Sequence, residues 1–559
     1  MSSARARMDA VYLAVSSPAR GVVEAVTLDA ELRETARERV PEEEFAGWAR
    51  DREAQHPRWV WADTKRWYPA LLAAGVRVDR CIDLRMCRLV LRSAAAAADT
   101  ELARAAPDRW DAPAPPTAPA ASDALFELDE PEPDDDPVVE LRRQRAAIAS
   151  SAAPSPLALL TAADSVGALV AVELEFAGLP WDADRHDRIL TELLGERTPG
   201  ARPAHMERLV GEIRAALDDP RVNPDSPPAL LRSLQRAGLR VGSTSRWELE
   251  ELEHPVIAPL LAYKRLARLH SANGWAWLAE WVHEGRFRPV YVPAGVVTGR
   301  WASDGGGALQ LPQQVRGAVV ADPGWRLVVA DAAQLEPRVL AAMSGDVAMA
   351  AAGRAHDLYE GMVATGAVET REQAKYGMLG AIYGGTTGES GRMRPRIERA
   401  FPRAMAFVEE AARAGEAGER VSTWLGRTSP PGRDAAYDET VDEGERARVR
   451  SDGRAWGRFT RNFVVQGTAA EWALCWMGAL RRMLWRLGGD DPAVPLTARP
   501  HLVLFLHDEL IVHTPAGLAE QVAEAMRASA AEAARILFGE APVEFPVSVA
   551  IVQSYAEAK

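Results

Sequence analysis

The stretch RLVVADAAQLEPRVLAAM, from Arg326 to Met343, decides the fold class. Its first part, Leu327 to Val329, is a short and partly β-branched apolar run of the kind found in buried strands, and Asp331 follows it closely. Beyond Asp331 the apolar residues recur every four positions, which predicts a helix whose first turn can accommodate Pro337. The sequence therefore predicts a carboxylate at a strand end beside a helix start, which suits a metal-bound, phosphate-handling site.

A second carboxylate is presented in a similar way near the C-terminus. The segment HLVLFLHDELIVHT, His501 to Thr514, has two apolar runs broken only by His507, Asp508 and Glu509. This pattern predicts a hairpin that projects Asp508 and Glu509 from its turn. Two strand-borne carboxylates can hold two Mg²⁺ ions for an in-line phosphoryl displacement. Each segment taken alone is equally consistent with an ordinary strand end and an ordinary acidic turn.

Five motifs in this chain resemble those of family A DNA polymerases, the DNA polymerase I class. Asp331 to Arg338 resembles motif A, and His507 to Leu510 resembles motif C. Between them, Arg371 to Lys375 with Tyr383-Gly384 is similar to motif B. The remaining two are the primer-template segment, carried by Thr298-Gly299-Arg300 with Gln310, and the template-contacting helix, carried by Arg458, Asn462 and Gln466 to Ala470. The chain resembles the actinobacterial-type short forms of this class, with a degenerate 3′→5′ exonuclease domain and no 5′-nuclease domain.

The resemblance implies an α/β (α+β) fold: a degenerate RNase H-like exonuclease domain followed by a right-hand polymerase with palm, fingers and thumb. The boundaries that we expect are 1–92 for the exonuclease-like domain, 93–155 for an Ala/Pro/acid-rich linker and 156–559 for the polymerase domain. Within the last, we place the thumb at about 185–285, the palm at about 286–345 and 455–559, and the fingers at about 346–454. The linker composition predicts a disordered or loosely packed insertion.

The implied reaction is attack of a primer 3′-hydroxyl on the α-phosphate of a deoxynucleoside triphosphate. By resemblance, two Mg²⁺ ions, with Mn²⁺ as the alternative, are held by Asp331, Asp508 and the backbone carbonyl of Ala332. Glu509 is expected to assist in the metal shell, with a role as a hydrogen-bond partner as the alternative. Lys375 is expected to donate a proton to pyrophosphate, and His507 to contact the primer terminus; an ordinary turn histidine is the alternative for His507.

The nucleotide is expected to lie along a helix that carries motif B. Arg371, Lys375, Leu379 and Tyr383 recur every four residues and so share one helical stripe, with the two cations placed to grip the triphosphate. Leu379 stands where the family has an aromatic residue, so we expect weaker nucleotide stacking and poor acceptance of dideoxynucleotides. Tyr376, which follows Lys375, is expected to face elsewhere, with compensation for the missing aromatic ring as the alternative. The glycines of the motif, Gly377, Gly380, Gly384 and Gly385, are expected to let nucleic acid approach the backbone.

Glu336 is expected to exclude the ribose 2′-hydroxyl while hydrogen-bonded to Tyr383, and Gln334 to support nucleotide binding.

The DNA contacts implied are minor-groove and template contacts, which check geometry without reading sequence. The residues assigned to them are Arg300, Gln310, Arg458, Asn462 and Gln466. In the thumb segment, Tyr263, Lys264, Arg268 and His270 are candidates for phosphate contacts, with a plain surface role as the alternative. The expected partners are primer-template DNA and dNTPs, and the expected state is a monomer.

The N-terminal segment offers a weaker resemblance. An exonuclease of this type needs an Asp-x-Glu pair on its first strand, which neither VYLAV nor GVVEAVTL provides. Trp67 stands where a metal-binding Asp is expected, and Asp63 and Asp83 are the only candidate carboxylates that we identify. We therefore expect a non-catalytic domain, with residual hydrolysis through Asp63 and Asp83 as the alternative.

Composition limits the remaining possibilities. The net charge of −13 argues against a nucleic-acid partner if it is evenly spread, but Asp123 to Glu140 hold nine acids and no bases, so the rest carries −13 + 9 = −4. Cys81, Cys87 and Cys475 are too scattered for a disulfide framework or a zinc site, so we expect reduced thiols. We find no apolar run long enough to span a bilayer and no signal peptide, and so expect a cytoplasmic, nucleoid-associated protein without membrane contact.

Three functions follow from these observations. The favoured one is template-directed DNA synthesis without proofreading, in repair or gap filling. The second is a catalytically inactive protein that binds primer-template junctions, and the third is a 3′→5′ exonuclease acting through the N-terminal domain. The pair Asp331 and Asp508 argues against the second because a binding protein needs no metal ligands, and the missing Asp-x-Glu argues against the third.

Overall fold

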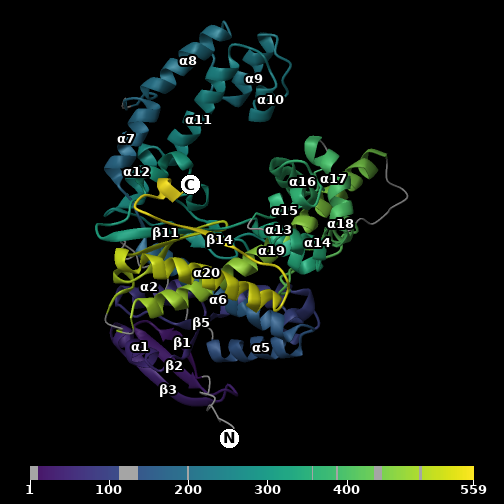
Figure 1. The fold of residues 1–559 in the computed structure, drawn as a ribbon. Coiled ribbons are helices and arrows are strands. Elements are labelled where there is room, and N and C mark those ends of the chain that lie inside the picture. Colours follow the sequence, from purple (N-terminus) through teal and green to yellow (C-terminus); the bar gives the residue numbers. More distant parts are fainter. Residues whose placement is uncertain are drawn as a thin grey trace. The chain divides into compact units, whose positions relative to one another are not determined.

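The computed structural model describes residues 11–112, 136–197, 200–354, 357–385, 388–432, 443–489, 491 and 494–558. The chain forms two compact units, each of which is built from three segments (Figure 1). The first unit comprises Met1–Ala177, Val290–Asp304 and Val328–Ile551. The second unit comprises Gly178–Pro289, Gly305–Leu327 and Val552–Lys559.

The N-terminal part of the first unit is a five-stranded mixed sheet with the order β3-β2-β1-β4-β5. Its strands are β1 (Tyr12–Ala19), β2 (Val22–Leu28), β3 (Glu34–Pro41), β4 (Arg58–Trp61) and β5 (Arg80–Asp83). The first three pair antiparallel, whereas β4 is parallel to β1 and β5 is parallel to β4. This is the arrangement of an RNase H-like domain, which agrees with the fold that the resemblance implied. The helices among these strands are α1 (Phe45–Glu53), α2 (Thr64–Ala73) and α3 (Leu84–Ser93).

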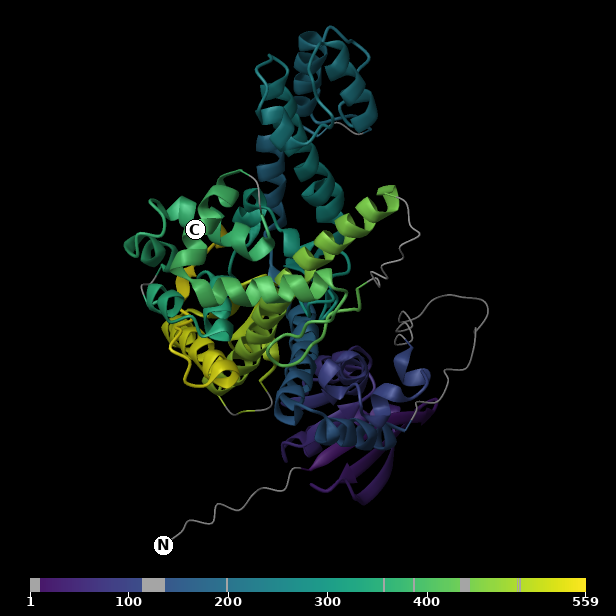
Figure 2. The ribbon, with the colours of Figure 1, turned by 90° about the vertical axis from the view of Figure 1, so that its right-hand side faces the viewer.

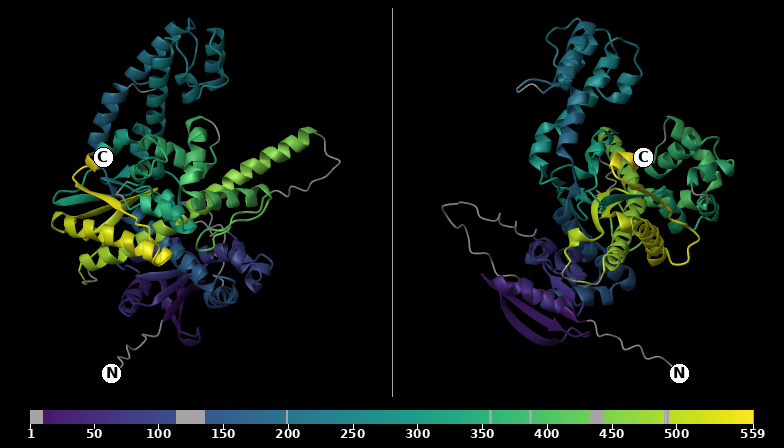
Figure 3. Two further views of the ribbon diagram at one scale, coloured as in Figure 1. Left: turned by 45° about the vertical axis from the view of Figure 1, so that its right-hand side comes forward. Right: turned by 60° about the vertical axis from the view of Figure 1, so that its left-hand side comes forward.

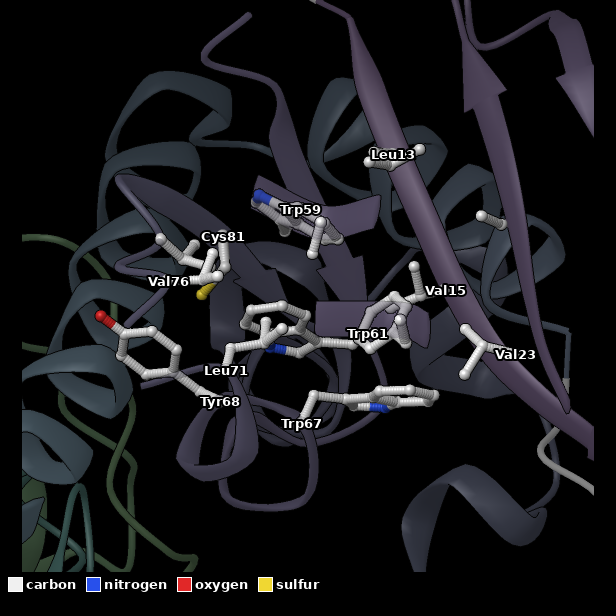
Figure 4. Close-up of a cluster of buried hydrophobic side chains, with 14 of the residues drawn as sticks. Leu13, Val15, Val23, Trp59, Trp61, Trp67, Tyr68, Leu71, Val76 and Cys81 are labelled. Carbon is white, nitrogen blue, oxygen red and sulfur yellow. The ribbon is translucent and has the colours of Figure 1, made fainter. Parts of the chain in front are cut away.

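An aromatic cluster fills the space beneath this sheet (Figure 4). Trp59 and Trp61 come from β4, Trp67 and Tyr68 come from α2, and all four are at least 92% buried. The ring of Trp67 lies 5.5 Å from that of Phe45 and meets it edge-on. Because aromatic side chains bury large apolar areas, this cluster stabilises the sheet strongly. Trp67 is therefore a core residue.

The described parts of the 93–155 segment are ordered, so the prediction of a disordered or loosely packed linker is wrong for them. They form the short elements η2 (Ala95–Ala97), α4 (Glu101–Arg104) and η3 (Arg109–Asp111), and the longer helix α5 (Pro137–Ser150). The buried guanidinium of Arg88 on α3 holds α5 through Glu140, at 2.9 Å, and η3 through Asp111. Composition missed this docking because an acidic stretch can still supply a helix cap, Asp136, and a buried ion-pair partner. Residues 113–135 lie outside the described chain.

The helix α6 (Pro154–Ala177) is long and apolar enough to cross a membrane by length and hydropathy, and so the expectation that no segment meets this test is wrong. However, 78% of its apolar window is buried inside the protein, as in a core helix. Its Glu173 accepts a hydrogen bond from Tyr68 of α2 (2.5 Å). The same carboxylate forms an ion pair with Arg481 of α19 (Glu443–Leu487). Fully buried charges need such partners. This network joins the N-terminal sheet domain to the rest of the first unit.

The second sheet of the first unit has the order β12-β13-β11-β14. It is made of β11 (Trp325–Ala332), β12 (His501–Leu506), β13 (Glu509–Pro515) and β14 (Val547–Val552). The strands β12 and β13 form the predicted antiparallel hairpin. Long helices accompany this sheet: α6 contacts β12, α20 (Ala519–Phe538) contacts β13, and α19 packs against both helices. The great length of α19 is best seen in Figure 3.

Between β11 and α19 the chain forms a group of helices, which occupies the segment that we assign to the fingers. They are α13 (Leu335–Ser344), α14 (Val347–Ala352), α15 (Leu358–Ala364), α16 (Arg371–Tyr383), α17 (Gly388–Ala400) and α18 (Pro402–Glu416). Gly377 is buried where α16 meets α17, and a Cβ atom there would lie 2.6 Å from Ile397. This glycine serves helix packing, so the expectation that it faces nucleic acid is wrong.

The second compact unit contains the segment that we assign to the thumb, and its long helices are seen side-on in Figure 2. They are α7 (Ala183–Leu194), α8 (Ala204–Ala216), α9 (Pro227–Arg236), α10 (Arg246–Glu250), α11 (Ile257–Asn273) and α12 (Trp275–Trp281). A small sheet pairs β8 (Arg286–Phe287) with β6 (Leu179–Pro180) and β7 (Val282–His283). Two further short strands, β9 (Tyr291–Val292) and β10 (Ala302–Ser303), pair within the first unit.

Of the four thumb residues considered for phosphate contacts, Tyr263 is only 1% exposed. Its hydroxyl donates to Asp225 (2.5 Å) and accepts from Arg202 (3.1 Å), which ties α11 to the loop before α9. A buried and fully bonded hydroxyl cannot also reach a phosphate, so this assignment is wrong for Tyr263. Arg268 is exposed on the same helix and remains a candidate.

Candidate active site

The two aspartates of the predicted site lie at neighbouring strand ends. The amide of Ala332, at the end of β11, donates a hydrogen bond to the carbonyl of Asp508 (2.9 Å). Asp331 and Asp508 are therefore adjacent across a backbone bond, although they are far apart in the sequence. Both side chains are half-buried, so each remains partly accessible.

The hairpin differs from the prediction in one respect. Leu506 pairs with Glu509, so the turn consists of His507 and Asp508 alone, and Glu509 is already the first residue of β13. Glu509 is 2% exposed. It does not project from the turn as expected, because strand pairing closes the hairpin one residue earlier. His507 takes the left-handed conformation (φ 60°) that a turn this tight requires.

The oxygen atoms at this strand end fit a magnesium ion. Mg²⁺ takes oxygen ligands and is commonly bound by one or two carboxylates, with water and substrate phosphates completing its shell. Asp331, Asp508 and the carbonyl of Ala332 are donors of this kind. Within the described part of the chain, no group of three or more His, Cys, Asp and Glu side chains could hold a metal ion. This donor set therefore suits an ion that shares its shell with a substrate more than it suits a closed structural site.

Glu336, in the first turn of α13 directly beyond β11, is held in place from two sides. Tyr383, the last residue of α16, donates its hydroxyl proton to Glu336 (2.6 Å), and Arg300 forms an ion pair with the same carboxylate. Burial and the neighbouring carboxylate of Glu336 raise the pKa of Tyr383 to about 12, so its hydroxyl stays protonated as a donor. Gln466 of α19 also hydrogen-bonds to this hydroxyl. Glu336 is thus fixed in position beside the strand end that carries Asp331.

The other end of α16 is anchored close to the same turn. Arg371, its first residue, donates to Asp357 at the N-terminus of α15 (2.8 Å). The next amide, that of Leu358, donates to the side-chain oxygen of Gln334 (3.2 Å). Although partial burial opposes ionisation, the hydrogen bond from Arg371 holds the pKa of Asp357 below its usual range. Both ends of α16 are therefore tied to the turn that follows Asp331.

Two residues of motif A have structural partners. The guanidinium of Arg338 is fully buried and donates to the carbonyls of Ala333 (3.0 Å), Gly353 (2.6 Å) and Glu544 (2.8 Å). The side chain of Gln334 bridges to α15, as described above. Sequence reasoning missed Asp357, because its only local signal is that of a helix cap. Its pairing with Arg371 depends on how α15 and α16 pack.

The helical stripe predicted for motif B is present. Ala374, Met378, Ala381 and Ile382 form the buried face of α16, whereas Arg371 and Lys375 are exposed and Leu379 and Tyr383 are half-exposed. The expectation that Tyr376 faces away from this stripe is wrong, because Tyr376 lines one pocket together with Leu379 and Tyr383. Its position follows from helical geometry, since residues three and seven apart lie on the same side.

The DNA-binding residues assigned to α19 also share one side of their helix. Arg458 is exposed and Asn462 and Gln466 are half-buried, at intervals of four residues. The side-chain oxygen of Asn462 is buried and accepts no hydrogen bond from any residue in the described ranges. A buried acceptor without a donor is costly to the folded state. Gly384 takes a left-handed conformation (φ 74°) and a Cβ there would lie 3.1 Å from Arg458, so a larger residue would be strained at this position.

The remaining two DNA-binding candidates lie in different places. His507 is exposed at the hairpin turn, and partial burial together with the nearby charge of Arg300 lowers its pKa, which keeps the imidazole neutral at neutral pH. Gln310 is exposed at the end of η4 (Ala308–Gln310) and belongs to the second compact unit. The structure therefore groups Arg300 and His507 with the paired aspartates.

The two N-terminal carboxylates serve as helix caps. Asp63 accepts the amide of Lys65 (2.8 Å) at the start of α2, and Asp83 accepts the amide of Met86 (3.1 Å) at the start of α3. Asp83 is fully buried and also accepts the amide and hydroxyl of Thr64, both at 2.8 Å. Burial, with a contribution from Asp63, raises the pKa of Asp83 above its usual range. The three cysteines are free and buried, as expected.

An N-terminal mixed sheet is thus followed by a second sheet that carries two neighbouring aspartates and by a helix with two exposed cations, an arrangement suited to divalent ions and phosphates. The model of DNA polymerase family A matches residues 203–557, and the chain belongs to this family. The chain is 31% identical over 391 residues to the thermostable DNA polymerase I of Thermus filiformis. The matched region covers 63% of this chain and 44% of the relative. The DNA polymerase I of Chloroflexus aurantiacus is 31% identical over 321 residues, covering 53% of this chain and 32% of the relative.

The chain thus spans less than half the length of these curated relatives. Among solved structures, it is similar to the POL domain of Pol1 from M. smegmatis in complex with DNA primer-template and dNTP. The TM-score is 0.67 at 17% sequence identity, with 99% of this chain and 96% of the other covered. At this identity the likeness concerns the fold.

Proposed function

We propose that this protein is a DNA-directed DNA polymerase that adds deoxynucleotides to a primer 3′-hydroxyl. The observation that carries the proposal is the backbone hydrogen bond between Ala332 and Asp508, which places Asp331 of β11 and the turn residue Asp508 next to each other. Membership of DNA polymerase family A supports it. The M. smegmatis domain was solved with primer-template and dNTP, which supports DNA and nucleotides as the partners.

The protein contributes alignment and charge in this reaction, since phosphoryl transfer leaves little covalent work to side chains. Divalent ions, when bound by Asp331, Asp508 and the Ala332 carbonyl, supply neutralisation of the developing phosphate charge. Arg371 and Lys375 bind the triphosphate along the exposed stripe of α16. Because Arg371 is paired with Asp357, the triphosphate has to replace or share that partner. Lys375 donates a proton to the departing pyrophosphate.

Sugar selection rests on Glu336. Its carboxylate is only 13% exposed and is held by Tyr383 and Arg300, so it cannot swing aside to admit a 2′-hydroxyl. A rigid group excludes an extra atom better than a mobile one does, because displacing it breaks both bonds.

A primer-extension assay with Mg²⁺ and dNTPs tests the proposal. We expect extension by the unmodified protein and none by Asp508→Ala. A 3′-end degradation assay, run with the same DNA and without dNTPs, distinguishes synthesis from hydrolysis. Binding of the junction without extension would instead support the inactive DNA-binding protein.

We also propose that the enzyme lacks proofreading. Trp67 occupies the core where a metal-binding carboxylate is expected, and the carboxylates of Asp63 and Asp83 are engaged as helix caps. Absence of 3′-end degradation in that assay is the expected result. Repair or gap filling, a monomeric state and a cytoplasmic location complete the proposal. A sedimentation measurement tests the monomer.

A further inference from the structure

The C-terminal half of α16 forms one wall of a pocket of about 560 Å³, here called the α16 pocket. Its lining includes Tyr376, Leu379, Gly380 and Tyr383, which follow each other at the spacing of one helix face. Gly384, Gly385 and Arg458 complete it. The pocket is therefore built of two aromatic rings, one aliphatic side chain, bare backbone and a single cation.

Tyr376 is one of the exposed aromatic residues in the described part of the chain, as are Trp247 and Trp424. It is 53% exposed, whereas neighbouring positions Gly377 and Met378 are buried. Among the residues that the structure describes, none makes a hydrogen bond or ring contact with Tyr376. Aromatic rings usually bury their faces, so an exposed ring that lines a pocket favours an apolar, planar occupant.

The chemistry of the other walls indicates which occupant fits. Three glycines leave the backbone open to close approach, and Leu379 offers a small aliphatic surface. A triphosphate needs several cations, but among the residues that the structure describes Arg458 is the only cation that lines this pocket, while Arg371 and Lys375 lie further along the helix towards its N-terminus. A nucleobase is planar, apolar on its faces and stacks well on tyrosine.

We propose that Tyr376 is a stacking platform for a nucleobase of the nascent base pair in the α16 pocket. The ring thereby supplies, one position beyond Lys375, the aromatic surface that Leu379 lacks. This inference rests on the proposed polymerase function and adds a specificity-determining residue to it. The base can come from the incoming nucleotide or from the template, and both share this chemistry.

Single-nucleotide primer extension with Tyr376→Leu and Tyr376→Phe tests the inference. Stacking of one base on an aromatic ring is worth about 1–3 kcal/mol, so we expect Tyr376→Leu to raise the KM for the dNTP by about 5- to 150-fold. We expect kcat to change less than about threefold, because the chemical groups are untouched. Tyr376→Phe keeps the ring and should behave as the unmodified protein.

Glu372→Gln is the matched control, because Glu372 is exposed on α16 and lies outside the pocket. A second template with an abasic site opposite the incoming nucleotide identifies the source of the base. If the ring stacks on the incoming base, the penalty of Tyr376→Leu persists on this template. If it stacks on the template base, the penalty disappears.

A KM within twofold of the unmodified protein for Tyr376→Leu on the intact template would overturn the inference while leaving the polymerase function in place. An equal KM increase in Glu372→Gln or in Tyr376→Phe would also overturn it, since neither change removes the ring. If the unmodified protein does not extend a primer, the proposed function fails and the inference fails with it. Because Tyr376 is exposed, its variants should keep the unmodified thermal unfolding midpoint.

Discussion

Two pairs of aspartates stand at strand ends in this chain, and their surroundings give them different roles. In the N-terminal sheet, Asp63 and Asp83 follow β4 and end β5, and their oxygens accept the amides that begin α2 and α3. In the second sheet, the N-cap residue of the helix after Asp331 is Gln334, which has a left-handed conformation and makes no side-chain cap hydrogen bond. A carboxylate engaged as a cap has lost much of its capacity for other ligands, whereas Asp331 is not the cap of the helix that follows it.

The comparison also involves the neighbours of each pair. Trp67 and the aromatic cluster stand close to Asp63, and burial raises the pKa of Asp83. Asp331 and Asp508 have a different environment. They are half-buried and lie near a chain of polar groups formed by Arg300, Glu336 and Tyr383. A strand-end aspartate is therefore no sign of catalysis by itself. What distinguishes the N-terminal pair is that both of its carboxylates accept the amides that begin the following helices.

The largest expected effect concerns the catalytic pair. Asp508→Asn keeps the shape of the side chain and removes its charge, so we expect primer extension to fall by more than about 10²–10³-fold, as for other groups that stabilise transition-state charge. Primer-template binding and the unfolding midpoint should change little. Extension rates and a DNA-binding titration measure both. Retention of more than a tenth of the activity would place the catalytic centre elsewhere.

A buried carboxylate outside both pairs shows what ionisation costs when no ligand uses the charge. Glu471 on α19 is 1% exposed and accepts bonds from Thr423 and the amide of Leu425 (3.1 Å), and burial raises its pKa from 4.5 to about 7. The folded state therefore holds an extra proton between these values, and the stability that depends on this proton is lost as the pH rises through about 7.

Glu471→Gln cannot ionise, so its free energy of unfolding relative to the unmodified protein should rise between pH 5 and pH 8, by up to about 3 kcal/mol. Denaturant unfolding at both pH values measures this difference. A difference that stays constant with pH would show that Glu471 has an ordinary pKa.

Asp83→Ala tests the capping role in the N-terminal domain. It removes the acceptor of three hydrogen bonds, two from Thr64 and one from Met86, so we expect a loss of about 1–3 kcal/mol in the free energy of unfolding. The KM and kcat of primer extension should remain unchanged at a temperature where the variant is folded. A specific loss of 3′-end degradation, with stability intact, would instead make Asp83 an exonuclease ligand.

The smallest effect concerns selectivity at the sugar. We expect Glu336→Ala to increase the ratio of ribonucleotide to deoxynucleotide incorporation by about tenfold or more, because it removes the group held against the sugar. Competing rNTP and dNTP in single-nucleotide extension measure the ratio. Tyr383→Phe, which removes only the hydrogen bond to Glu336, should give a smaller change in the same direction. An unchanged ratio in Glu336→Ala would assign selection to another residue.

Local sequence patterns determined much of this protein. Alternation and β-branched runs predicted β1, β2, β11 and the hairpin of β12 and β13, and the four-residue recurrence from Arg371 to Tyr383 predicted α16 with the correct exposed face. These features depend on residues within a few positions of one another, where backbone geometry fixes the side-chain direction.

Only the tertiary structure decided which distant groups meet. The bond from Ala332 to Asp508, the pairing of Arg371 with Asp357, the docking of α5 through Arg88 and Glu140, and the packing of Gly377 against Ile397 all join segments that no local pattern connects. Partners of this kind are selected by the free energy of burying whole surfaces and satisfying every buried polar group, which is a property of the complete fold.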